Sequence, residues 1–164
     1  MTLNYDDLLG VPYVEGKDDC FELMRKFYSA NYNINMPPYA RPSLWWAKAP
    51  ELDLLRKNLA DNGFVPFDRT PRNLLPGDAL LMQIGSSVLD HCGAYLGSGR
   101  FLHHPFRGKS EVALLAGLWG DRVMITARHK DIVHTDDRPT LDLMELLPAQ
   151  KRERYRAILA QYGK

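Results

Sequence analysis

The chain has 164 residues, which is enough for one domain with a hydrophobic core of its own. Its 21 basic and 20 acidic residues leave a net charge of +1, so the charge balance predicts no nucleic-acid partner and no attraction to an anionic membrane. No apolar run approaches the roughly 20 residues that a membrane-spanning helix needs. The first residues lack the basic and apolar regions of a signal peptide, so we expect synthesis in a cytosol without a cleavable signal.

The first half of the chain is predicted to be mainly helical. We expect a short helix over residues 5–9, a loop over 11–17, and then a helix that either Asp18 or Asp19 could cap. This helix must end before Pro37, and its apolar residues recur at helical spacing: Phe21, Met24, Phe27 and Tyr28. Residues 39–50 read as irregular, and residues 51–62 as an amphipathic helix that Gly63 ends.

The second half is predicted to contain an antiparallel sheet. A turn over residues 75–78 leads into an apolar strand over 79–84, and strands over 91–96 and 100–104 form a hairpin through residues 97–99. A further strand is expected over 122–129, followed by C-terminal helices over 141–147 and 149–162. Helices, then antiparallel strands, then helices make an α+β layout.

Two cysteines, Cys20 and Cys92, are too few for a disulfide framework and fit a reducing compartment. Cys20 lies in the first turn of its predicted helix, where the helix dipole lowers a thiol pKa and backbone N–H groups could bind an oxyanion. A buried cysteine acting as a small apolar residue is the alternative. Cys92 lies in the middle of a strand, and we interpret it as a core residue.

Strand alternation places His91 and Gly93 on one face, which makes His91 the candidate base for Cys20. A purely structural histidine is the competing interpretation. Gly93 is expected to leave room for a substrate or for the helix that carries Cys20. His103 and His104 point to opposite faces, so either could orient His91: an odd loop or a bulge favours His103, and a simple even loop favours His104.

Four groups of residues form a pattern of order and spacing: residues 9–13 with Asp18-Asp19-Cys20, residues 76–82, residues 91–97 and residues 101–104. This pattern resembles the NlpC-type, papain-like cysteine peptidases of bacterial cell-wall metabolism. It resembles in particular the versions found in tail-tip proteins of lambda-like long-tailed phages. Ser110 and Arg128-His129 also match, so the resemblance spans most of residues 5–130 and leaves out the C-terminal helices.

The resemblance implies a papain-like α+β fold, in which N-terminal helices pack on a central antiparallel sheet. The predicted C-terminal helices are additional to that fold. Residues 1–135 would form the peptidase domain, and residues 136–164 a helical extension packed on it or docking from it. By the same resemblance, Cys20 is the nucleophile, His91 the base and His103, which aligns without a gap, the third residue, with His104 as its alternative. Tyr13 and Asp19 would position the substrate or an oxyanion.

The implied activity is a cysteine endopeptidase that needs no cofactor and no metal. Its substrates would be peptidoglycan stem peptides, cleaved at a γ-D-glutamyl–diamino acid bond. The protein would belong to a virion tail tip, contact other tail-tip proteins, and act at the host cell wall or periplasm during wall penetration, tail assembly or both. Phe21-Glu22 follow Cys20, where bacterial members carry Ser-Gly, and the segment between Cys20 and His91 is longer than in those members.

Two other functions compete with the peptidase. A zinc hydrolase could use Cys20, His91 and another histidine as ligands, although the sequence lacks a close-spaced pair such as H-x-x-x-H. A non-catalytic tail-tip assembly module would use the C-terminal leucines and an aromatic segment for docking. The large aromatic residues fit the core or a partner interface better than a glycan groove; they are Tyr39, Trp45, Trp46 and Trp119. Three arginines could meet substrate carboxylates or solvent: Arg41, Arg100 and Arg107.

Overall fold

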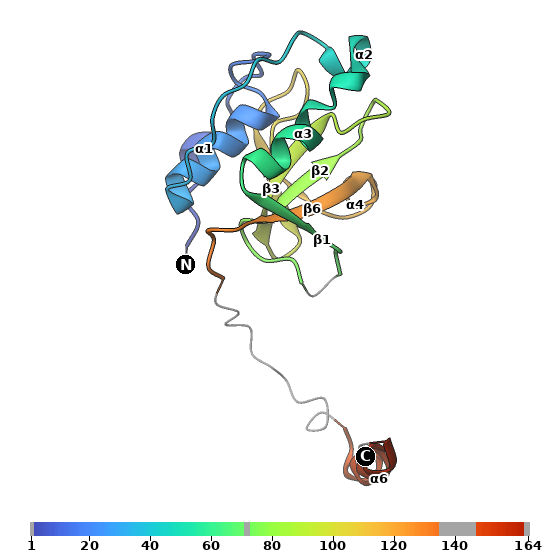
Figure 1. Ribbon diagram of the computed structural model, residues 1–164. Helices are drawn as coiled ribbons and strands as arrows, with labels where there is room; N and C mark the ends of the chain where they lie inside the picture. Colours follow the sequence, from blue (N-terminus) through green and yellow to red (C-terminus); the bar gives the residue numbers. More distant parts are fainter. Residues whose placement is uncertain (1, 71–72, 135–146, 163–164) are drawn as a thin grey trace. The chain divides into compact units, whose positions relative to one another are not determined.

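The computed structural model describes residues 2–70, 73–134 and 147–162 (Figure 1). Contacts divide the chain into two compact units, Met1–Val133 and His134–Lys164. The second unit contains helix α6, Ala149–Tyr162, which confirms the prediction for residues 149–162. The predicted helix over 141–147 lies almost entirely outside the described residues. Within the described ranges, no helix combines the length and the apolar composition needed to cross a membrane.

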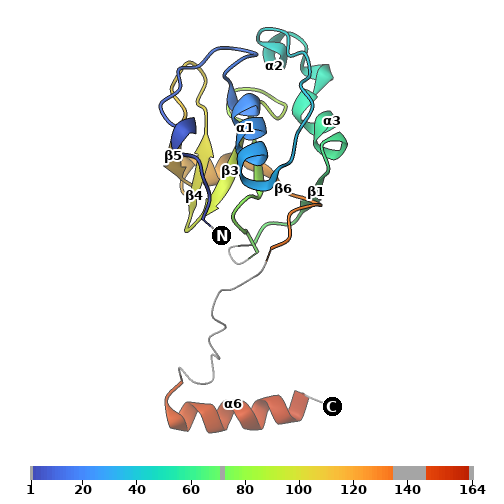
Figure 2. The same cartoon turned by 90° about the vertical axis from the view of Figure 1, so that its left-hand side faces the viewer.

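The first unit is built on a six-stranded sheet whose order is β1-β6-β2-β3-β4-β5 (Figures 1 and 2). Every neighbouring pair is antiparallel, so the predicted α+β class is confirmed. The strands are β1 (Phe64–Phe67), β2 (Ala79–Met82), β3 (His91–Gly97), β4 (Arg100–His103), β5 (Glu111–Leu114) and β6 (Val123–His129).

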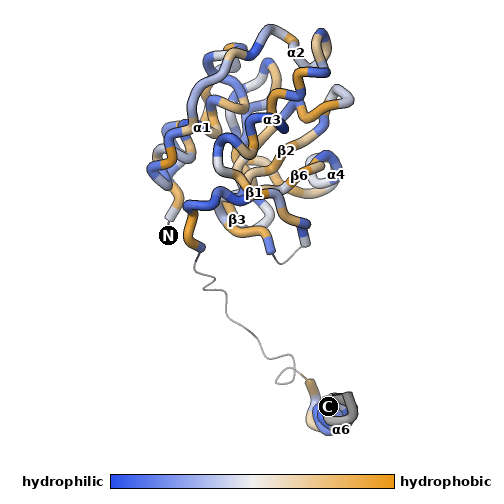
Figure 3. Tube along the Cα trace, in the orientation of Figure 1, coloured by the Kyte–Doolittle hydropathy of each residue, from blue (hydrophilic) through white to orange (hydrophobic). Residues whose placement is uncertain are grey.

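Strand β2 lies near the middle of this sheet and is buried along its whole length. It is apolar throughout rather than alternating, because both of its faces are covered (Figure 3). Ala79 and Leu81 belong to the main core, beside the helices. Leu80 and Met82 belong to a smaller cluster on the opposite face, with Phe101.

Helix α1 (Cys20–Tyr32) lies across β3 and contributes five buried residues to the main core (Figure 2). Asp19 caps it by accepting a hydrogen bond from the Glu22 N–H, which settles the choice between Asp18 and Asp19. Asn33 ends it in the left-handed conformation, at φ 55°. The Ile34 N–H then donates to the Tyr28 carbonyl, as helix ends of this kind require.

The predicted helix over residues 51–62 is wrong in part. Residues Pro50–Leu52 form a short 3-10 helix (η2), and α3 covers only Leu54–Asp61. Asp53 separates the two at φ 37°, a left-handed conformation that no regular helix accepts. The stretch read as irregular contains one further turn of helix, α2 (Trp45–Lys48). Near the N-terminus, the predicted short helix is a 3-10 helix, η1 (Asp6–Leu8).

Strands β1 and β5 and the short helix α4 (Leu118–Arg122) were not predicted. Pro66 in β1 argues against a strand, because proline cannot donate to a ladder. The structure places β1 at the edge of the sheet, where a proline is tolerated. Both missed strands are edge strands of four residues, too short to show a clear alternation.

Candidate active site

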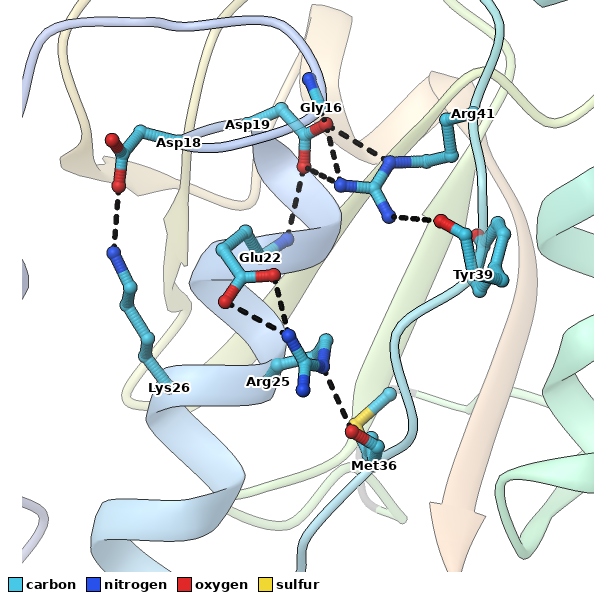
Figure 4. Close-up of polar contacts among 9 residues, drawn as sticks. All are labelled: Gly16, Asp18, Asp19, Glu22, Arg25, Lys26, Met36, Tyr39 and Arg41. Atoms are coloured by element: carbon cyan, nitrogen blue, oxygen red, sulfur yellow. Dashed lines mark hydrogen bonds and ion pairs between the residues drawn. The ribbon is translucent and has the colours of Figure 1, made fainter.

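Cys20 is the first residue of α1 and is half-buried. Its position is set by the neighbouring Asp19, whose carboxylate accepts hydrogen bonds from the Gly16 N–H and the Glu22 N–H, each at 3.0 Å (Figure 4). Asp18 instead pairs with Lys26, at 2.6 Å. The thiol therefore lies in the first turn of a well-capped helix, where the dipole favours a thiolate.

Arg41 forms a buried ion pair with the Asp19 carboxylate. Its Nε and Nη2 atoms donate to the two carboxylate oxygens at 3.0 and 3.1 Å, and both side chains are over nine-tenths buried (Figure 4). The guanidinium also lies over the rings of Phe21 and Tyr39, at 4.9 and 5.2 Å from their centroids. Arg41 is thus a buried structural partner of the helix cap, rather than a surface charge.

The pKa of the Cys20 thiol is held well below its ordinary value. The largest cause is a hydrogen bond with the Cys92 thiol; a hydrogen bond with His91 and its charge act in the same direction, against burial and the Asp19 carboxylate. The pKa of Cys92 is raised well above its usual range, first by this hydrogen bond and then by burial, so Cys92 keeps its proton. Cys92 is a core residue, as predicted, but its contact with the candidate nucleophile was missed.

His91 opens β3, and its Nε2 lies 3.0 Å from Nδ1 of His103 on β4. His91 is 6 % exposed and His103 is fully buried. The hairpin carries a register shift between Tyr95 and Gly97, and this bulge places His103 opposite Gly93. Of the two open alternatives, the structure therefore brings His103, and not His104, to His91.

Gly93 has a different role from the one expected. A Cβ at this position would meet the Leu102 carbonyl oxygen at 2.7 Å, Cδ2 of Phe101 at 2.9 Å and the His103 Cβ at 3.2 Å. The space beside Gly93 is therefore filled by β4, and is not kept for a substrate or for α1. The missing side chain lets β4 bring His103 close to His91.

The far side of His103 is enclosed by groups that the sequence did not indicate. The Trp119 ring packs at 4.5 Å from the His103 ring and 5.8 Å from the His91 ring. Nε2 of His103 faces the Glu111 carboxylate at 3.5 Å across the β4–β5 pair. Burial, with the nearby His91 and His104 rings, lowers the pKa of His103 to about 3, so this ring is neutral at ordinary pH.

Tyr13 lies in the loop before α1, which Ser110 anchors. The Ser110 hydroxyl accepts from the Val11 N–H at 2.9 Å, and the Tyr13 N–H donates to the Gly108 carbonyl at 3.0 Å. Burial, and then the charges of Cys20, Asp19 and Glu15, raise the pKa of Tyr13 far above its usual range, so its hydroxyl stays protonated. The Tyr13 ring meets the buried His104 ring edge-on, with centroids 5.5 Å apart.

One pocket lies at this site, and it is lined by Cys20 and His91 but not by His103. Trp45 is core, as expected for the large aromatic residues, but it also lines this pocket together with the half-buried Trp46. The complete lining is Tyr13, Glu15, Asp19, Cys20, Phe21, Arg41, Trp45, Trp46, Leu55, Asp90, His91, His104 and Phe106.

The arrangement around His91 does not form a metal site. Nε2 of His91 is already hydrogen-bonded to Nδ1 of His103, so these two nitrogens face each other instead of a shared metal position. Across the described ranges, no three His, Cys, Asp or Glu side chains are grouped to hold a metal ion. The charged neighbours of His129, Arg128 and Lys130, suggest a surface residue. The His129 ring is instead buried against Phe64.

Comparison with known proteins gives two related phage proteins. The chain is 34 % identical over 125 residues to the tail tip assembly protein K of Escherichia phage lambda, and 28 % identical over 125 residues to that of Escherichia phage N15. These matches cover 75 % and 76 % of this chain, but only 59 % and 50 % of the two relatives. The chain therefore spans little more than half the length of the curated relatives it matches.

Solved structures confirm the fold. An NLP/P60-family protein described as similar to lipoprotein, from Staphylococcus aureus, matches with a TM-score of 0.52 and 19 % identity, over 79 % of this chain and 39 % of its own. An NlpC/P60-family protein from Bacillus cereus matches with a TM-score of 0.51 and 21 % identity, over 79 % of this chain and 41 % of its own. The model of the NlpC/P60 family matches residues 10–128, which include Cys20, His91 and His103. The chain belongs to the NlpC/P60 family.

Proposed function

We propose that this protein is a cysteine endopeptidase of peptidoglycan stem peptides. The observation that carries the proposal is the sequence of contacts from Cys20 to His91 to His103. Cys20 and His91 line one pocket, His91 helps to depress the pKa of the Cys20 thiol, and the neutral His103 ring behind them is hydrogen-bonded to His91. A nucleophile, a base and a group that orients the base are the parts that acyl transfer needs.

In the proposed mechanism, the Cys20 thiolate attacks the scissile carbonyl carbon and forms a tetrahedral intermediate. His91 holds the thiol proton on Nδ1, the nitrogen that does not face His103, and gives it to the leaving amine as the C–N bond breaks. Water, deprotonated by His91, then hydrolyses the thioester and restores the thiol. Neutral His103 accepts from the His91 Nε2–H and fixes its tautomer, while its own Nε2–H faces Glu111.

The oxyanion of this intermediate needs donors at the start of α1. The Cys20 backbone N–H lies in the first turn, where N–H groups have no intrahelical acceptor. The Tyr13 hydroxyl is the second candidate donor, because its raised pKa keeps it protonated. Asp19 would position the oxyanion donors indirectly, by holding the start of α1, because its carboxylate already accepts hydrogen bonds from the Glu22 N–H and from Arg41.

The family and the relatives support the proposed substrate and setting. We propose the γ-D-glutamyl–diamino acid bond as the bond cleaved, a virion tail tip as the location, and other tail-tip proteins as partners, since both phage relatives are named tail tip assembly proteins. Residues 1–135 would carry the peptidase. The extension over 136–164, with α6, would dock on that domain or on a neighbouring tail protein.

Mass spectrometry of stem peptides incubated with the full chain tests the activity. Wild type is expected to release new fragments that name the bond, and Cys20→Ala and His91→Gln to release none. Equal fragments from wild type and Cys20→Ala would exclude Cys20 as the nucleophile.

A second candidate function is a non-catalytic assembly module, and the names of the two relatives favour it. The test is a phage that carries Cys20→Ala. Tails that assemble and infect normally, together with no cleavage by wild-type protein, would support the assembly module and exclude the peptidase.

A further inference from the structure

His104 lines the pocket beside Cys20 but takes no part in the His91–His103 pair. It is 2 % exposed, and its ring meets Tyr13 edge-on. The charges of Cys20 and Asp19 raise the pKa of His104, but by less than burial lowers it. Burial nevertheless keeps the pKa of His104 below its ordinary value, and the ring is therefore neutral at pH 7.

The two ring nitrogens of His104 differ in their partners. Nε2 is buried and has no hydrogen-bond partner among the residues that the structure describes. The ring does bond the backbone of Val11, and this contact favours the protonated ring, so the backbone group is an acceptor. A neutral imidazole has one donor and one acceptor nitrogen. Because Nε2 has no partner, we assign the Val11 contact to Nδ1–H, which makes Nε2 the acceptor nitrogen of the ring.

The carboxylates of the same pocket already have donors on both oxygens. Asp19 accepts from two backbone N–H groups and from Arg41, and Glu15 accepts from the Ser43 hydroxyl and the Leu44 N–H. Asp90 accepts from the N–H groups of residues 84 and 85. Nε2 of His104 differs from these carboxylates, because it has no partner among the described residues and belongs to a side chain that lines the pocket. Buried polar atoms without partners are rare, and each calls for an explanation such as a functional role or a bound water or ion.

We propose that Nε2 of His104 accepts a hydrogen bond from a backbone N–H of the bound peptide and so positions the substrate beside Cys20. A peptide carries such donors on both sides of its scissile bond. The inference rests on the proposed peptidase function and adds a substrate-binding residue to it. His104 would hold the peptide, whereas His91 would handle the proton.

The test measures binding of an intact stem peptide, with a γ-D-glutamyl–diamino acid bond, to the full chain carrying Cys20→Ala. Adding His104→Phe keeps a ring against Tyr13 but removes both nitrogens, and should weaken binding by about 5- to 100-fold, as leaving one buried donor unpaired does. Adding His104→Gln keeps an acceptor near Nε2 and should restore most of the affinity. His129→Phe is the matched control, because His129 is also buried and meets a ring edge-on, at 5.1 Å from Phe64.

Thermal melting of each variant checks its folding. If His104→Phe does not fold, His104→Asn replaces it, because the shorter amide can still donate to Val11 but leaves no acceptor at Nε2. Equal binding by the parent and the His104 variants overturns the inference, as does a parent that binds no peptide.

Cleavage measured in parallel tests the two proposals separately. Equal cleavage by wild type and His104→Phe would refute the role of His104 and leave the peptidase standing. His104-dependent binding without any cleavage by wild type would refute the peptidase and leave the binding site.

Discussion

Replacing Gly93 by alanine tests whether the approach of β4 to β3 is what assembles the two histidines. The added Cβ would lie 2.7 Å from the Leu102 carbonyl oxygen and 3.2 Å from the His103 Cβ, so β4 must move. Overpacking of a buried site costs about 1–3 kcal/mol. For a chain of this length, that lowers the melting temperature by about 2–12 °C.

The same shift displaces His103 from its 3.0 Å contact with His91. A misplacement of about 1 Å costs on the order of 100-fold in rate, and we expect kcat/KM on stem peptides to fall accordingly. Gly85→Ala is the matched control, since its Cβ would meet nothing closer than Asp90 Oδ2 at 3.9 Å. The reasoning is refuted if Gly93→Ala melts and turns over like Gly85→Ala.

Three further predictions concern charge. Cys92→Ala removes the hydrogen bond that most lowers the pKa of Cys20, so alkylation of Cys20 should require a higher pH; an unchanged profile would contradict that contact. The pKa of His103 falls from 6.5 to about 3 on folding, so the unfolded chain takes up this proton first. Stability measured by urea unfolding should therefore drop as pH falls from about 6.5 to 3, by up to about 1.4 kcal/mol per pH unit, and less steeply in His103→Gln. Arg128→Met leaves Asp78, fully buried and 2.7 Å from Arg128 Nε, without this cation and should cost about 3 kcal/mol. Adding Asp78→Asn should recover part of that loss. If the double variant instead loses the sum of the two single losses in unfolding free energy, Arg128 and Asp78 do not stabilise each other.

Local signals predicted the parts of the fold and site that depend on neighbouring residues. The Asp-Cys pair, the helical spacing after it and the prolines that end the helix are enough to place Cys20 at the start of α1. Alternation in the hairpin assigned His91 and Cys92 to opposite faces. The choice between His103 and His104 depended on a bulge at Tyr95–Gly97, which a glycine-rich loop permits but does not require.

The remaining features depend on contacts between distant segments. Cys92 reaches Cys20 only because α1 lies across β3, and Trp119 and Glu111 enclose His103 only once α4 and β5 are in place. The strand pattern predicted Cys92 as a core residue, but it did not indicate that this face of the strand meets α1. His129 was misread because its charged neighbours suggested a surface, whereas strand pairing buries it opposite Phe64.

The position of β6 governs when this protein can fold during synthesis. The last strand of the sheet to be made is inserted between β1 and β2, where Ala127 pairs with both Pro66 and Ala79. A nascent chain that has passed His103 holds all three proposed catalytic residues, yet its β2 still exposes an unpaired edge. Closing the sheet waits for residue 129 to leave the ribosome, and non-local pairing of this kind folds slowly. The pocket is therefore assembled late, after nearly all of the Met1–Val133 unit has been translated.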